Sequence, residues 1–184
     1  SFRPIRLFIS RNEQPSAMTD ANANTPLTYD QAGVNYDLID PLKVAAQRAA
    51  AETGANLAAH GFSEMPASRG ESAYVADVGP FYLASIVECL GTKTLVADDM
   101  AKLTGKSYYD GIAQDTIAMA VNDLITVGAT PLVVQAYWAA GGSDWFGDKI
   151  RANALVAGWK KACDTCQVSW GGGETPALAG IVAD

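Results

Sequence analysis

Three short clusters of polar residues in this sequence carry side chains suited to binding phosphates and metal ions. Carboxylates hold divalent cations, whereas an ammonium group and the N–H groups of a glycine-rich backbone bind phosphate oxygens. Ligand sites in layered sheet proteins commonly form where strands end and helices begin, so the clusters predict a ligand site. They comprise Glu88, Gly91, Thr92 and Lys93, then Asn122 and Asp123, and finally Gly171, Gly172, Gly173, Glu174 and Thr175.

The second cluster belongs to a polar stripe on a predicted helix. Asp115, Met119 and Asn122 stand at i, i+4 and i+7, so they share one helical face. Aspartate is a mediocre helix former, and its presence in an apolar helix needs a reason. The stripe is either solvated or places a carboxylate toward a site, where it binds Mg²⁺ or an amine.

The glycine run before Glu174 has two interpretations. Glycines mark turns and bulges, so the run can be purely structural. Alternatively its backbone approaches a phosphate closely, and Glu174 is then a metal ligand or general base. Neither common phosphate loop is present, because Thr92 separates Gly91 from Lys93 where a P-loop needs Gly-Lys, and no GxGxxG occurs.

The elements that must position these clusters follow from periodicity and from stop signals. Asp40 suits an N-cap, Pro41 a first helical position and Gly54 a helix end. Residues 61–80 lack periodicity and predict a long loop, followed by a buried strand over 81–88. The remaining predictions are helices over 94–103, about 107–127 and 148–161, strands over 132–140 and 166–170, and the start of a fourth strand at 181–184.

This order predicts an α+β fold, a mixed sheet of about four strands with helices on one face. Residues 1–27 read as an N-terminal arm and residues 28–184 as one domain. An exposed sheet edge is a liability. We therefore expect a homodimer joined through residues 81–88 or 132–140, which light scattering can test.

Composition limits the partners. The net charge is −7, so the chain repels a phosphate backbone and we expect no nucleic-acid partner. No apolar run approaches the roughly 20 residues of a membrane span, and the N-terminal apolar patch is too short for a signal-peptide core. We therefore expect a cytoplasmic protein without membrane contact.

The three cysteines, with a CxxC at Cys163 and Cys166, do not suggest a disulfide framework. The pair is either two thiols near a helix end, or a redox pair or half of a zinc site. His60 is the only histidine available to complete a zinc site.

Four motifs in order resemble the aminoimidazole ribonucleotide synthetase (phosphoribosylformylglycinamidine cyclo-ligase) family, N-terminal domain. Tyr29, Ala32, Gly33 and Val34 match its first signature, and ECLGTK resembles its Asp-Gly-Val-Gly-Thr-Lys. DTIAMAVNDLITVGATPL and GGET match the remaining two. The resemblance covers about residues 29–175.

The resemblance implies an activity and its cofactors. Members use ATP and Mg²⁺ to activate an amide oxygen of formylglycinamidine ribonucleotide, a small phosphorylated substrate, and close the imidazole ring. Relatives with this N-terminal domain act on other oxygens by the same logic, and they include selenophosphate, thiamine phosphate and hydrogenase-maturation enzymes. Two copies join their sheets into a shared barrel, with ATP near that interface.

By matching position, the resemblance gives roles to the predicted site residues. Glu88, Asp123 and Glu174 would be the metal carboxylates, and Asp123, Glu174 and Lys93 the catalytic set, with Lys93 near the phosphates. The nucleotide-binding set would be Glu88, Gly91, Thr92, Asn122, Gly172, Gly173 and Thr175.

The sequence also departs from the family pattern. Glu88 and Cys89 stand where the family has Asp and Gly, and Pro176, Ala177 and Leu178 replace Ala-Glu-Met. The family's second domain does not follow. We therefore expect the N-terminal part of a longer ligase, inactive alone, or a degenerate homologue that dimerises and binds nucleotide.

Overall fold

The structure, a computed structural model, describes residues 34–182. The chain divides into two compact units, residues 1–44 and 45–184, and the predicted arm lies outside the described residues. Helix α1 (Tyr36–Thr53) begins five residues before the predicted first position, Pro41, which lies inside it. Asn35 caps it instead of Asp40, because the Asn35 side-chain oxygen accepts a hydrogen bond from the backbone N–H of Leu38 at 3.2 Å.

Residues 61–80, predicted as a loop, contribute two strands to a small antiparallel sheet. Strands β1 (Ser63–Glu64), β2 (Tyr74–Asp77) and β3 (Tyr82–Ser85) pair in the order β1-β2-β3. Two 3₁₀ helices, η1 (Gly54–His60) and η2 (Pro66–Ser68), precede and follow β1. β3 is shorter than the predicted strand and largely exposed, so the prediction of a buried strand over 81–88 was wrong.

The rest of the second unit follows the predicted order of elements, except for the short helix α4 (Ser143–Gly147), which was not predicted. Helices α2 (Lys93–Thr104) and α3 (Tyr109–Thr126) lead to strand β4 (Val133–Tyr137). Helices α4 and α5 (Lys149–Cys166) then lead to strand β5 (Ser169–Glu174), which pairs with β4 in parallel.

The strands form two sheets in the described chain, of three and two strands, not one sheet of about four. The physical reason is the direction of pairing. β3 folds back antiparallel onto β2, with Asp77 opposite Tyr82, whereas β4 and β5 pair only with each other among the named strands. The mixed α/β character is confirmed, and the barrel shared by two copies stays a prediction.

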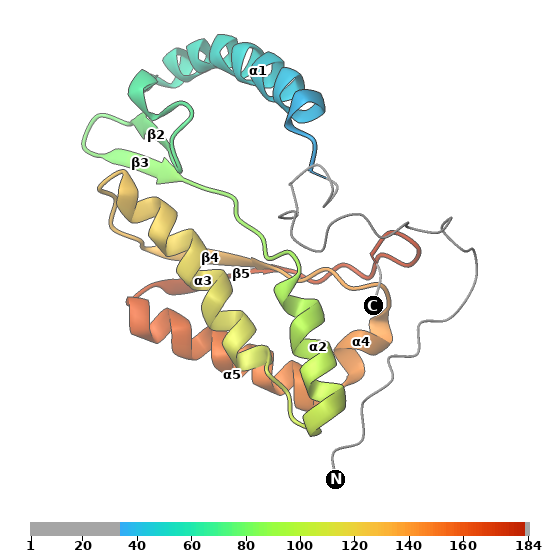
Figure 1. The fold of residues 1–184 in the computed structure, drawn as a ribbon. Coiled ribbons are helices and arrows are strands. Elements are labelled where there is room, and N and C mark those ends of the chain that lie inside the picture. Colours follow the sequence, from blue (N-terminus) through green and yellow to red (C-terminus); the bar gives the residue numbers. More distant parts are fainter. Residues whose placement is uncertain (1–33, 183–184) are drawn as a thin grey trace, which may run out of the picture. The chain divides into compact units, whose positions relative to one another are not determined.

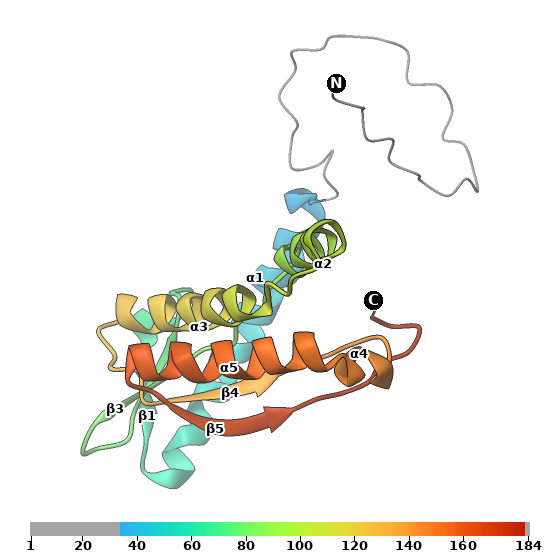
Figure 2. The ribbon, with the colours of Figure 1, turned by 90° about the horizontal axis from the view of Figure 1, so that it is seen from below.

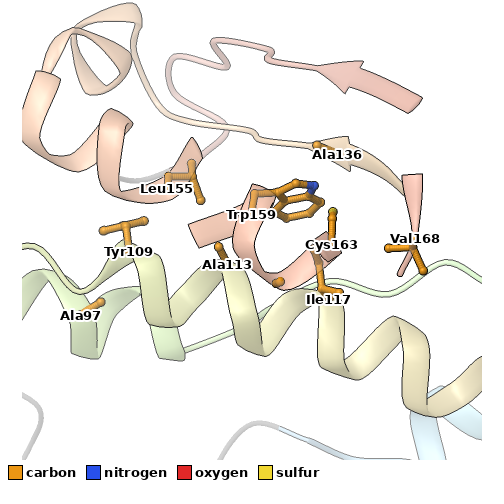
Figure 3. Packing of buried hydrophobic residues seen from close by; sticks show 10 residues of the cluster. Ala97, Tyr109, Ala113, Ile117, Ala136, Leu155, Trp159, Cys163 and Val168 are labelled. Atoms are coloured by element: carbon orange, nitrogen blue, oxygen red, sulfur yellow. The ribbon is translucent and has the colours of Figure 1, made fainter. Parts of the chain in front are cut away.

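Helices α3 and α5 lie side by side on one face of β4 and β5 (Figures 1 and 2). The two helix backbones approach closely at Gly158, where an added β-carbon would lie 2.5 Å from the Cα of Asp110. Figure 3 shows Trp159 and Cys163 of α5 beside Ala136 of β4. The buried cluster comprises Ala97, Tyr109, Ala113, Ile117, Ala136, Leu155, Trp159, Ala162, Cys163 and Val168.

The other face of β4 carries apolar side chains that are more than half exposed in the described chain. Val133 is 56% exposed and Tyr137 67%, whereas Ala136 between them is 5% exposed and belongs to the core. This alternation is that of a strand with one packed face. Among residues 34–182, none of the helices combines the length and the apolar character needed to cross a membrane.

Candidate nucleotide site at the start of helix α2

Lys93 is the first residue of α2, and its ammonium group forms an ion pair with Asp115 of α3. The Lys93 Nζ and Asp115 Oδ2 atoms are 2.7 Å apart. Both side chains are about half exposed, at 55% and 47%, so a ligand in solution can reach them. The Asp115 carboxylate of the polar stripe is thus half exposed and binds an amine of this chain, that of Lys93.

The turn before α2 is formed by the residues that precede Lys93. The hydroxyl of Thr94 donates to the carbonyl oxygen of Gly91 at 3.3 Å, and Thr92 is the N-terminal flanking residue of the helix. The resemblance assigned Gly91 and Thr92 to nucleotide binding. Both residues are exposed, and they adjoin Lys93 in the chain.

A second polar contact fixes α2 against α3. The hydroxyl of Tyr109 lies 3.1 Å from each carboxylate oxygen of Asp98, and Arg151 of α5 approaches Asp98 at 3.8 Å. Tyr109 is 3% exposed, so this contact lies at the edge of the core. It sets the place of α2, and with it the place of Lys93 on the surface.

The GGGE run belongs to strand β5 and is not a loop after a strand. Gly172 pairs with Gln135, Gly173 with Ala136 and Glu174 with Tyr137, and the register shifts between Val134 and Gln135. A β-carbon on Gly173 would lie 1.9 Å from the carbonyl oxygen of Ala136. Close strand pairing therefore requires this glycine, which supports the structural interpretation of the run as a strand irregularity.

The three predicted metal carboxylates come from separate parts of the fold. Glu88 is exposed in the connection between β3 and α2, Asp123 lies in the last turn of α3, and Glu174 ends β5. Among residues 34–182, no group of three or more His, Cys, Asp or Glu side chains could hold a metal ion. The predicted convergence of the three carboxylates on one metal is therefore not found in the described chain.

Chain direction explains why Asp123 and Glu174 are separated. α3 ends a few residues before β4 begins, so Asp123 lies toward the start of β4. β5 runs parallel to β4, and Glu174 pairs with Tyr137 at the far end. Figures 1 and 2 both show the C-terminal ends of α3 and β5 at opposite ends of the layer.

The described second unit also has an open, mostly apolar groove of about 1010 Å³. It is lined by the hairpin of β2 and β3 and by the connection from α3 to β4, and none of the predicted site residues lines it. The groove is therefore separate from the candidate nucleotide site.

A polar cluster near β1 was missed in the sequence. Arg69 donates to both carboxylate oxygens of Glu64 and to the carbonyl oxygen of Ala50, and Tyr74 donates to Glu64 at 3.3 Å. The hydrogen bond from Arg69 lowers the pKa of Glu64, and the same bond raises the pKa of Arg69. Sequence spacing gave no signal for it, because the residues belong to segments predicted as loop or helix end.

The thiols of the CxxC differ in their surroundings. Cys163 is 4% exposed within the core, whereas Cys166 at the end of α5 is partly exposed. Burial is the main cause that raises the pKa of Cys163, followed by the neighbouring Cys166. A buried, protonated thiol is a poor metal ligand and nucleophile, so the structure favours the structural interpretation of this pair.

Comparison with protein-family models matches residues 70–182 to "AIR synthase related protein, N-terminal domain". The chain belongs to this family. The resemblance drawn from the four motifs is thereby confirmed, and the match includes the Lys93–Asp115 pair and the whole of β5.

Curated relatives carry the name phosphoribosylformylglycinamidine cyclo-ligase. The protein of Methanobrevibacter smithii is 31% identical over 158 residues, which cover 86% of this chain and 42% of the relative. That of Coxiella burnetii is 31% identical over 172 residues, 90% of this chain and 43% of the relative. That of Pyrococcus furiosus is 35% identical over 117 residues, 64% of this chain and 32% of the relative. The chain thus spans less than half the length of these relatives.

Proposed function

We propose that this chain is the N-terminal part of an ATP-dependent cyclo-ligase of purine biosynthesis, which acts in the cytoplasm. The longer enzyme would convert formylglycinamidine ribonucleotide to aminoimidazole ribonucleotide, and the chain would contribute nucleotide binding. The single observation that carries the proposal is the family match over residues 70–182, with relatives named as cyclo-ligases. We expect no activity from this chain alone.

The ATP phosphates would bind at the start of α2. Lys93 would face the phosphate oxygens, and Gly91 and Thr92 would form the adjoining turn. The half-exposed ammonium group supports this role, because a phosphate can approach it without rearrangement of the core. In phosphoryl transfer the protein mainly positions groups and neutralises charge, and a lysine at this place can do both.

Magnesium would arrive with the nucleotide. Mg²⁺ usually keeps several waters and takes only one or two carboxylates in addition to substrate phosphates. The lack of a three-carboxylate group among residues 34–182 is compatible with this mode, whereas a dedicated protein site does not fit the described chain. We propose Glu88 and Glu174 as candidate carboxylates for this ion. Asp123 keeps the nucleotide role that the resemblance implies, without a metal shared with Glu174, and Asn122, Gly172, Gly173 and Thr175 keep their nucleotide-binding role.

Two copies of the chain would form a homodimer through their sheets. The apolar faces of Val133 and Tyr137 on β4 and of Leu83 on β3 are more than half exposed and support such an interface. Light scattering at micromolar concentration measures the mass directly. A monomer under these conditions would contradict the proposed dimer.

Titration of the chain with Mg-ATP by calorimetry tests the proposal. We expect saturable binding that weakens in Lys93→Met and Asp123→Ala, whereas Lys161→Met, an exposed lysine on α5, should bind as the parent chain does. The absence of binding at millimolar Mg-ATP would refute the proposed nucleotide site.

Departures from the family pattern favour a second candidate, a homologue without catalysis that dimerises and binds nucleotide. Glu88 and Cys89 replace the family's Asp and Gly directly before Leu90 and Gly91. A longer protein in which a C-terminal half follows this chain separates the two candidates. Turnover of the ribonucleotide by the longer protein would support the ligase, and binding without turnover would support the second candidate.

A further inference from the structure

The Lys93–Asp115 pair differs from an ion pair that lies on the surface of a single helix. Lys102 and Asp99 are three residues apart on α2, and their charged atoms are 3.0 Å apart. Lys93 and Asp115 are 22 residues apart, and their pair joins α2 to α3. The stability of either helix alone therefore does not explain this pair.

The position of Lys93 on its own helix also requires explanation. Lys93 is the first residue of α2, where the partial positive charge of the helix dipole disfavours a cation. Asp115 supplies the opposite charge from the neighbouring helix. The lysine is consequently held by α3, and its direction is set by a contact between elements.

The geometry leaves Lys93 able to bind a second anion. An ammonium group has three N–H donors, and the contact to Asp115 uses one of them. The side chain of Lys93 is 55% exposed, so the other donors face solvent that a ligand can replace.

We propose that Asp115 is a positioning residue for Lys93, which it holds in place to meet a phosphate oxygen of the bound nucleotide. The inference rests on the proposed function, which gives Lys93 its phosphate contact. The alternative is that Asp115 weakens nucleotide binding, because a carboxylate near the site repels phosphate. The two effects predict opposite changes in affinity when the charge of Asp115 is removed.

Calorimetric titration of the 184-residue chain with Mg-ATP decides between them. We expect Asp115→Asn to raise the Kd about two- to fivefold, the range of a partly exposed charge pair. Asp115→Glu, which keeps the carboxylate, should recover most of the affinity. Asp99→Asn, which breaks the Lys102 pair on the same helix, is the matched control and should bind as the parent chain does.

A double-mutant cycle separates positioning from a purely structural role. If Asp115 acts through Lys93, then Asp115→Asn has no further effect on the Kd in a Lys93→Met background. An equal loss in both backgrounds, or unchanged or tighter binding in the single variant, would overturn the inference. Failure of the parent chain to bind Mg-ATP would instead overturn the proposed function, and unchanged binding by Lys93→Met would remove the role of that lysine.

Discussion

The layer of α3 and α5 on β4 and β5 buries large side chains, with Ile117 at 1% and Trp159 at 3% exposure. Residues 63–85, which form the three-stranded sheet and its connections, bury only Ser68, Ala73 and Ala76. Instead, polar contacts link its segments. The Ser68 hydroxyl accepts from the Val75 N–H at 2.9 Å and donates to the Met65 carbonyl oxygen at 2.8 Å.

The difference shows that two parts of one small unit are stabilised by different forces. The helical layer depends on apolar packing, which is insensitive to pH and sensitive to volume. The sheet depends on hydrogen bonds and on the Arg69–Glu64 ion pair, which respond to protonation. Each of the following experiments tests one side of this comparison.

Removal of a large core side chain should have the largest effect. Trp159→Ala leaves a cavity beside Trp138 and Trp170, whose ring centroids lie 5.5 and 6.0 Å from that of Trp159. We expect a loss of about 3–5 kcal/mol in the free energy of unfolding, measured by urea denaturation. Ile150→Ala on the same helix, where Ile150 is 72% exposed, should cost less than about 0.5 kcal/mol. Similar losses for both variants would contradict a packed core at Trp159.

Addition of one methyl group between the helices should have the next largest effect. In Gly158→Ala the new β-carbon meets the backbone of Asp110 at 2.5 Å, so α3 and α5 must move apart. We expect destabilisation of about 1–3 kcal/mol by the same measurement. Gly111→Ala, at a helical position with no atom within 4 Å, should be neutral or stabilising by up to about 1 kcal/mol. A neutral Gly158→Ala variant would show that the helices do not approach as closely as described.

Acidification should act on the sheet more than on the helical layer. The pKa of Glu64 lies below its ordinary value of 4.5, mainly because Arg69 donates hydrogen bonds to the carboxylate. A lowered pKa contributes stability above the ordinary value, and this contribution disappears as the pH falls through the folded-state value. We expect Glu64→Gln to melt below the parent chain at pH 7, and the gap to shrink below about pH 4.5. A gap that is independent of pH would assign the effect to packing.

Glu52→Gln is the control for this experiment, because Glu52 is an exposed carboxylate of α1. The melting temperature of Glu52→Gln should equal that of the parent chain at pH 7 and below about pH 4.5. The helical core offers a second comparison, since Trp159→Ala should destabilise the chain to a similar extent at neutral and acidic pH.

The reactivity of the Cys163 and Cys89 thiols should differ without any change in the stability of the chain. This is the smallest of the four expected effects. Cys163 is buried and its pKa is raised, whereas Cys89 is exposed in the connection before α2. We expect alkylation of Cys163 in the native chain to be at least about tenfold slower than that of Cys89 at about pH 7.5. Mass spectrometry of the labelled peptides measures both rates. Unfolding in urea should remove most of the difference, and equal rates in the native chain would contradict burial of Cys163.

The helices were predictable because their signals are local. Asp148 accepts hydrogen bonds from the N–H groups of Ile150 and Arg151, as an N-cap should, and α5 starts at the next residue. The sheet of β1 to β3 was not predictable. Its strands are two to four residues long, which is too short for a clear alternation of apolar and polar residues. The pairing of Glu64 with Ala76, twelve positions later, has no local signal in the sequence.

The candidate site was likewise predictable only in part. Lys93 was singled out because an ammonium group after a strand and before a helix suits a phosphate. Asp115 was one of the polar residues of α3, for which the sequence allowed two interpretations, a solvated stripe or a carboxylate placed toward a site. Its contact with Lys93 depends on the packing of α2 against α3, which neither residue specifies.

The sequence by itself determined helices α2, α3 and α5 and the family to which residues 70–182 belong. Both depend on residue types at short spacing, which the chain carries before it folds. The tertiary structure alone decided that the glycine run lies inside β5, that Asp115 holds Lys93, and that Asp123 and Glu174 lie toward opposite ends of the layer. The physical reason is that strand pairing and helix packing fix chain direction and register, and these set distances between residues far apart in sequence.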